Sequence, residues 1–164
     1  MRTTVIELAK EEMKFSAGHF TIFGAGDREN FHGHNFTVAV GIEGLVDETQ
    51  GMLSDYSVYK RWIIDRCHLW NETFMLPTLS PHLQVDSKED GNVVARFGDE
   101  ILYFLARDVT LMAAANITLE ELSRLFGEGL IEDQERLRRD RIISVTVKCS
   151  SGPGQSASWY WKKT

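Results

Sequence analysis

Two stretches of the chain alternate strictly between apolar and polar residues, and this pattern restricts the fold more than any other feature of the sequence. Apolar side chains occupy every second position from Phe36 to Ile42, and the same period returns from Ile143 to Cys149. A period of two is typical of a strand with one buried face. We expect a further strand over Thr4 to Ala17. The chain therefore predicts a sheet that has one face in contact with a core.

Two segments have the period of an amphipathic helix, one from Ser54 to about Trp70 and one that starts at Thr118. Asp55 is expected in the first turn of the first helix, and Thr118 forms a capping box with Glu121. The charged run Glu132 to Arg141 is expected to fray the second helix and to be a solvated surface. The apolar stripes consist of Val58, Trp62, Ile63 and Leu69 in the first helix and of Leu119, Leu122, Leu125, Phe126 and Leu130 in the second.

Turn residues divide the rest of the chain. The stretch Leu83 to Leu105 alternates around two turn signals and predicts a small β meander between the helices. Near the end, a Gly-Pro-Gly turn at residues 152–154 separates the strand that ends at Cys149 from the aromatic segment Trp159 to Trp161. The expected order is two strands, a helix, the meander, a helix and two strands.

Length and charge exclude several classes of protein. The chain has 164 residues, enough for one ordinary core, and we expect a single domain over residues 1–164. Its 18 Lys and Arg against 24 Asp and Glu give a net charge of −6, which argues against nucleic acid as a partner. No apolar run is long enough to span a bilayer, and Met1 to Glu12 lacks the layout of a signal peptide. Two cysteines, Cys67 and Cys149, are too few for a disulfide framework. We expect no membrane partner and a cytoplasmic location.

Three of the five histidines, His19, His32 and His34, lie within sixteen positions at the end of the first strand and the start of the second. Residues two apart in a strand point to the same face, so His32 and His34 present their imidazoles side by side, and an antiparallel pairing can bring His19 opposite them. Three imidazoles suit a zinc ion that keeps its fourth position open, as catalytic sites do.

A simpler interpretation remains open from the spacing alone, since paired histidines also occur by chance at the edge of a sheet, and the 13-residue spacing from His19 matches no short zinc motif. His68, near the end of a helix, and His82, after a proline, are expected to be structural or surface residues.

Several segments of the sequence resemble those of a known protein family. The stretches Phe15-Ser16-Ala17-Gly18-His19-Phe20 and Phe31-His32-Gly33-His34-Asn35-Phe36 resemble the zinc-binding signature of the 6-pyruvoyl-tetrahydropterin synthase family, which includes the 6-carboxytetrahydropterin synthases. The similarity continues through Gly51 to Asp55, Phe74 to Pro77 and Pro153 to Gln155.

The resemblance implies an α+β T-fold, in which a four-stranded antiparallel sheet carries two helices on one face and subunits assemble as trimers or dimers of trimers. It implies that His19, His32 and His34 hold a zinc ion. The zinc would bind the side-chain hydroxyls of 7,8-dihydroneopterin triphosphate or a related pterin while a base removes a neighbouring proton.

The family's catalytic residues do not all carry over. Most members have a cysteine just before the His-x-His pair, whereas this chain has Glu29 three positions before His32, and Cys67 lies in the wrong segment to replace the thiol. Glu29 resembles the subgroup in which a glutamate replaces the cysteine and 6-hydroxymethyl-dihydropterin is released. As a base, Glu29 would need burial to raise its pKa. The alternative is a solvated loop carboxylate beside Arg28.

Two further positions differ from the family. Its Asp-His dipeptide is replaced by Asn71-Glu72, which makes Glu72 a candidate acid or base or, alternatively, an exposed carboxylate at a helix end. The glutamate that binds the pterin's amidine edge is replaced by Ser151, which cannot form a bidentate pair. Glu120 is a candidate for the pocket wall or, alternatively, a partner of the helix dipole.

Three hypotheses account for these features. In the first, the chain is a zinc-dependent pterin lyase that uses Glu29 and Glu72. In the second, it is a zinc-containing T-fold protein that binds a different small molecule or serves as a non-enzymatic scaffold. In the third, it is a zinc enzyme for another heterocycle or carbonyl compound. Three ligands with an open fourth position favour the lyase.

Overall fold

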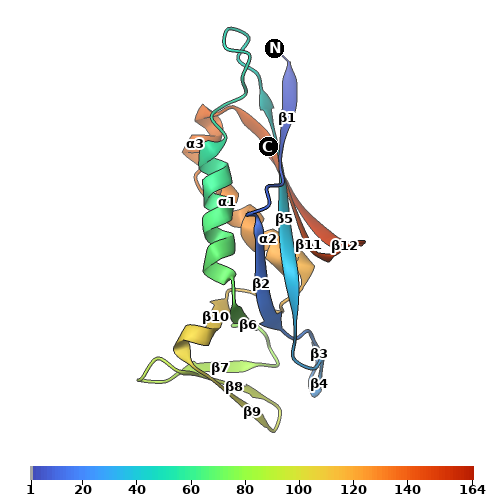
Figure 1. Ribbon diagram of the computed structural model, residues 1–164, viewed down its shortest axis with the longest axis vertical. Coiled ribbons are helices and arrows are strands. Elements are labelled where there is room, and N and C mark those ends of the chain that lie inside the picture. Colours follow the sequence, from blue (N-terminus) through green and yellow to red (C-terminus); the bar gives the residue numbers. More distant parts are fainter. Residues whose placement is uncertain (1) are drawn as a thin grey trace.

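A seven-stranded mixed sheet carries the helices on one face (Figure 1). The computed structural model describes residues 2–164. The expected α+β class is confirmed. The strand order is β10-β6-β2-β5-β11-β12, and β1 also pairs with β5. In chain order the elements are β1 (Thr3–Leu8), β2 (Lys14–His19), β3 (Ile22–Gly24), β4 (Asp27–Arg28), β5 (His32–Leu45), α1 (Ser57–Trp70), β6 (Thr73–Pro77), β7 (Gln84–Ser87), β8 (Val93–Phe97), β9 (Glu100–Phe104), the single 3₁₀ turn η1 (Ala106–Asp108), β10 (Val109–Met112), α2 (Leu119–Ile131), α3 (Gln134–Arg139), β11 (Ile142–Gly152) and β12 (Gln155–Lys162).

The prediction of one continuous strand at the start of the chain is wrong. The stretch from Thr4 to Ala17 divides into β1 and β2, which both pair antiparallel with the long strand β5. Between them, the amide of Met13 donates to the carbonyl of Lys10 at 3.0 Å and closes a turn. The Met13 side chain is buried, so the interruption places an apolar residue in the core instead of breaking the sheet.

The sheet also has more strands than the four that the sequence predicts. Strands β6 and β10 run parallel to β2 and to each other, since α1 returns the chain along the sheet before β6 begins. Three consecutive residues of β6, Met75, Leu76 and Pro77, are buried. Because both faces of β6 are covered, the strand has no period of two, and the sequence pattern could not reveal it.

Helix α1 starts later than expected, and only part of its expected apolar stripe, Trp62 and Ile63, packs in the core. It begins at Ser57, and Asp55 lies outside its first turn, where its carboxylate accepts a hydrogen bond from the Ser57 amide at 2.9 Å. Val58 and Leu69, which were expected in the apolar stripe, are 40% and 64% exposed. The residues that share the buried face are Tyr59, Ile63, Cys67 and Trp70.

Helix α2 follows the sequence prediction closely. Thr118 is the N-cap, and its hydroxyl accepts a hydrogen bond from the Glu121 amide at 3.3 Å. The Glu121 carboxylate binds Arg124, so the described residues form one half of the expected capping box. The charged run beyond α2 was expected to fray. Instead it forms the short helix α3. Asp133 caps this helix by accepting from the Arg136 amide, and Leu137 anchors it in the core.

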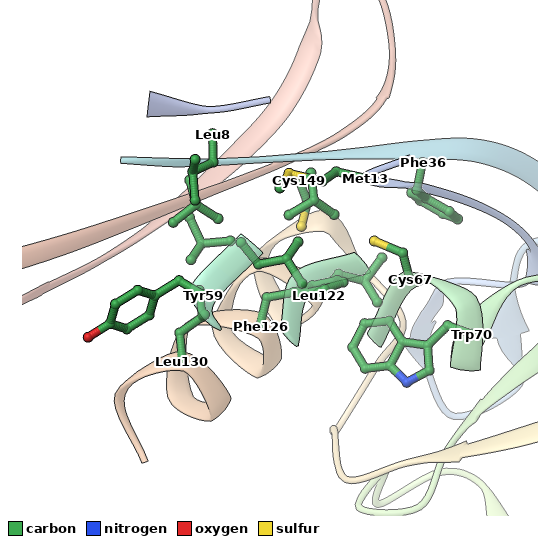
Figure 2. Close-up of a cluster of buried hydrophobic side chains, with 14 of the residues drawn as sticks. Leu8, Met13, Phe36, Tyr59, Cys67, Trp70, Leu122, Phe126, Leu130 and Cys149 are labelled. Carbon is green, nitrogen blue, oxygen red and sulfur yellow. The ribbon is translucent and has the colours of Figure 1, made fainter. Parts of the chain in front are cut away.

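The main core lies between the sheet and helices α1 and α2 (Figure 2). Aromatic rings form its centre: Phe15 of β2 stacks on Phe36 of β5 at 5.0 Å, and Trp70 of α1 meets Phe126 of α2 edge-on at 4.7 Å between centroids. The thiols of Cys67 and Cys149 are free and fully buried in the same core. This packing fixes β2 and β5, which carry the three histidines.

The predicted meander is confirmed as strands β7, β8 and β9, which form a separate antiparallel sheet at one end of the molecule (Figure 1). Its apolar face covers a second, smaller core. The buried residues of this core are Phe20, Ile22, Leu76, Leu83, Val93, Ala95 and Phe97. The meander therefore packs against the segment that follows β2.

Gly127 of α2 allows β12 to approach the helix closely. A Cβ atom at this position would lie 2.0 Å from Cε3 of Trp159, which packs against the main core. An alanine would gain up to about 1 kcal/mol in helix propensity but must displace the indole. We therefore expect Gly127→Ala to lower the free energy of unfolding by about 1–3 kcal/mol, as overpacking does, in urea denaturation.

Gly24→Ala is the matched control, because a Cβ there meets no atom within 4 Å. It should change the free energy of unfolding by less than about 0.5 kcal/mol. A Gly127→Ala protein as stable as the unsubstituted chain would contradict the account of the α2–β12 contact.

Candidate metal centre and adjoining cavity

The pairing of β2 with β5 brings the three histidines together. His19, the last residue of β2, lies opposite His32, the first residue of β5, and Ala17 lies opposite His34. The expected antiparallel juxtaposition is confirmed. The centroid of the His19 ring is 4.5 Å from that of His32 and 5.3 Å from that of His34. One ring nitrogen from each side chain lies within 4.8 Å of the other two, so the group could hold a metal ion.

Backbone carbonyls orient two of the rings. Nδ1 of His19 donates to the carbonyl of Ile117 at 3.0 Å, and Nδ1 of His32 donates to the carbonyl of Asn30 at 2.8 Å. A carbonyl only accepts, so Nδ1 carries the proton and the lone pair is on Nε2 in both rings. Such hydrogen bonds are the usual outer support of histidine ligands.

The surroundings of His19 show whether the three histidines fit a metal ion. Its Nε2 is buried and has no hydrogen-bond partner within residues 2–164, although a buried polar atom normally has one. Burial of the ring and the neighbouring His32 lower the pKa of His19 to about 4. The imidazole is therefore neutral at pH 7, the form that binds a metal. An unpaired lone pair beside two further imidazoles fits a metal ion.

The histidines form part of the wall of a cavity of about 250 Å³ between the sheet and the start of α2. Three of the predicted site residues also line it, Glu29, Ser151 and the exposed Glu120. Much of the remaining polar wall consists of Thr21, Thr118 and Gln155, which were not predicted as site residues. The cavity could admit a small polar molecule against the open side of the three imidazoles.

Glu29 lies beside the histidines. Its Oε2 accepts a hydrogen bond from the Thr21 amide at 2.9 Å and lies 3.7 Å from Nε2 of His32. The pKa of Glu29 is lowered, chiefly by hydrogen bonds from Thr21, so the raised pKa that a base at this position would need is absent. The carboxylate is ionised at neutral pH and can accept a proton. Arg28 pairs with Glu100 instead of the Glu29 carboxylate.

Glu72 lies on a neighbouring cavity of about 450 Å³, which shares His34 with the first. The residue adopts a left-handed backbone with φ 59°, and its amide donates to the Ser16 carbonyl at 2.7 Å. Asn71 Oδ1 accepts from the Ser16 amide at 2.8 Å. The Asn71-Glu72 pair therefore joins the end of α1 to β2, and Glu72 is separate from the cavity that Glu29 lines.

The remaining candidates lie away from the histidine group. His68 and His82 are exposed, as expected. Cys67 lies in the main core, and burial raises the pKa of its thiol to about 12, so it cannot act as a base at neutral pH. No helix of residues 2–164 is both long and apolar enough to cross a membrane.

The chain is similar to one protein family and to solved structures of that family. The sequence profile of the 6-pyruvoyl tetrahydropterin synthase family matches residues 7–160. The 6-pyruvoyl tetrahydropterin synthase of Plasmodium vivax has 25% identity and a TM-score of 0.91 over 99% of this chain and 100% of that one. The Plasmodium falciparum enzyme has 24% identity and a TM-score of 0.89 over 98% and 99%. No curated protein sequence matches.

These similarities confirm the T-fold that the family resemblance implied. The profile extends from β1 into β12 and so includes all three histidines and every residue that lines the cavity. The chain therefore belongs to the 6-pyruvoyl tetrahydropterin synthase family.

Proposed function

We propose that the chain is a zinc-dependent lyase of pterin metabolism that acts on 7,8-dihydroneopterin triphosphate or a related pterin. One observation carries the proposal: three clustered imidazoles, two of them oriented by backbone carbonyls, and an ionised carboxylate, Glu29, line the same small cavity. Membership of the 6-pyruvoyl tetrahydropterin synthase family supports the pterin chemistry.

His19, His32 and His34 would hold the zinc ion. Three neutral nitrogen ligands that leave a fourth position free are typical of catalytic zinc sites. When bound, zinc supplies a Lewis acid that polarises a hydroxyl or carbonyl oxygen of the substrate. The carbonyls of Ile117 and Asn30 hold two of the rings at fixed angles, which reduces the reorganisation needed when the metal binds.

Glu29 would accept the proton from the substrate side chain. Its carboxylate is within reach of the histidine group, and the Thr21 amide fixes one of its oxygens. A solved structure of the Plasmodium vivax synthase carries an alanine in place of a glutamate that is described as a catalytic residue of that protein. That comparison supports a glutamate in this role, although the lowered pKa makes Glu29 a weak base.

The cavity wall would recognise the pterin through polar side chains. Ser151 and Gln155 can donate and accept single hydrogen bonds, and Glu120 at the first turn of α2 offers a carboxylate. Glu72 would contribute a second acid or base through the neighbouring cavity that shares His34. Ser151 cannot bind an amidine edge in a bidentate manner, and this favours, as a second candidate, a zinc protein that binds a different small molecule.

We also propose that the chain acts as a homo-oligomer, a trimer or a dimer of trimers, in the cytoplasm. Strands β10 and β12 end the main sheet, each with one unpaired edge within the described residues, and such edges can pair with a second copy. The two free, buried thiols fit a reducing compartment.

Replacement of one ligand tests the metal site. His34→Ala should weaken zinc binding by more than about 100-fold, which exceeds the loss seen when only an outer-shell partner is removed. The zinc content after dialysis, measured by mass spectrometry, checks this. His68→Ala, at an exposed histidine of α1, should keep full zinc content. Full zinc content in His34→Ala would overturn the ligand assignment.

Product analysis tests the lyase. Zinc-loaded protein incubated with 7,8-dihydroneopterin triphosphate should yield a 6-hydroxymethyl or 6-pyruvoyl product on chromatography. Glu29→Gln keeps the shape but not the charge, and should lower the rate at least about 100-fold, as loss of a general base does, at unchanged zinc content.

Glu89→Gln, at an exposed position of the meander, is the control and should match the unsubstituted protein. Unchanged substrate in the presence of zinc-loaded protein would reject the lyase and favour the second candidate.

A further inference from the structure

Arg28 lies where the meander meets the β3–β4 hairpin. Its side chain is 15% exposed, and its guanidinium lies among three phenylalanine rings. The distances from Cζ to the ring centroids are 5.1 Å for Phe20, 5.0 Å for Phe31 and 5.8 Å for Phe97. Cation–π contacts on several sides restrict both the position and the plane of the guanidinium.

The hydrogen bonds of Arg28 connect the meander to Glu29. Nε and Nη2 donate to Oε2 of Glu100, the first residue of β9, at 2.8 and 2.5 Å. Nη1 donates to the backbone carbonyl of Glu29 at 2.8 Å. A single buried guanidinium therefore joins the edge strand of the meander to the backbone of the residue whose carboxylate lines the cavity.

The other side of Glu29 is held by Thr21. The Glu29 amide donates to the Thr21 carbonyl at 2.9 Å, and the Thr21 amide donates to the Glu29 carboxylate at 2.9 Å. Loss of the contact from Arg28 would leave Glu29 with its two hydrogen bonds to Thr21 and its approach to His32, at the end of a two-stranded hairpin. A short isolated hairpin is marginally stable by itself.

We propose that Arg28 and Glu100 are positioning residues that fix the Glu29 carboxylate beside the histidines. The meander supports the Arg28–Glu100 contact, because Glu100 belongs to its strand β9. None of the described residues that line the histidine cavity belongs to the meander, and Arg28 gives the meander a hydrogen-bonded connection to Glu29 in addition to its packing against Phe20 and Ile22. The inference rests on the proposed role of Glu29 as the proton acceptor.

The effect of the Arg28–Glu100 contact on turnover can be separated from its effect on the stability of the fold. Glu100 is 54% exposed, and an ion pair with so much solvent access contributes little to the stability of the fold. A displacement of about 1 Å in a catalytic group, in contrast, lowers turnover by as much as about 100-fold. Loss of the Arg28–Glu100 contact should therefore change turnover much more than it changes folding.

The test uses zinc-loaded full-length protein with Arg28→Met, Glu100→Gln and their combination. Each single change should lower kcat by between about 10-fold and 100-fold, with KM within about twofold and zinc content unchanged. Hydrogen exchange of the amides of residues 21–31 should become faster. The double variant should be no slower than Arg28→Met alone, since both changes remove one connection. Arg28→Lys keeps a charged donor and should recover part of kcat.

The matched control is another ion pair of the same meander, Arg96–Asp86, at 2.9 Å, which forms no hydrogen bond or ion pair with Arg28 or Glu100 among the described residues. Arg96→Met combined with Asp86→Asn should leave kcat and the exchange of residues 21–31 unchanged. Equal acceleration of exchange in this control would overturn the proposal, because general loosening of the meander would then explain the effect. Unchanged kcat or unchanged exchange in the Arg28 and Glu100 variants would also overturn it.

The two readouts separate this proposal from the proposed function. If the unsubstituted zinc-loaded protein makes no product, the lyase assignment fails. Hydrogen exchange then decides the structural connection by itself: faster exchange in Arg28→Met but not in the control supports it, and exchange as in the unsubstituted protein overturns it.

Discussion

The antiparallel register of β2 and β5 is the constraint on which the site depends. It places His19 opposite His32, and a slip of one residue would turn the side chains of a strand to the other face of the sheet. The aromatic contact between Phe15 and Phe36, on the same two strands, anchors this register in the main core. The packing of the core and the geometry of the histidines are therefore set by one strand pair.

Much of the site could be predicted because its chemistry is local in the sequence. His32 and His34 are two positions apart in a strand, and the signature around His19 indicates the neighbouring strand. Long-range contacts could not be predicted in this way. The carbonyl of Ile117 orients His19 from 98 positions away, and no pattern of side chains reports which backbone carbonyl will face a ring.

The differences between expectation and fold have a similar origin. The buried face of the first helix was only partly predicted: Ile63 is buried as expected, but Val58 and Leu69 are apolar yet exposed, and Tyr59 and Cys67 occupy the interface. Strand β6 has no alternation, because core residues cover both of its faces. Hydrophobic periodicity locates elements that separate a core from solvent, and it loses its signal for those enclosed between two cores.

The central claim is that three imidazoles hold one zinc ion and leave a position open to the cavity. X-ray absorption at the zinc edge of the loaded protein measures this first shell directly. The account predicts three imidazole nitrogens at about 2.0–2.1 Å and one further light ligand, with no sulfur. A sulfur shell at about 2.3 Å, or a spectrum without imidazole scattering, would contradict it.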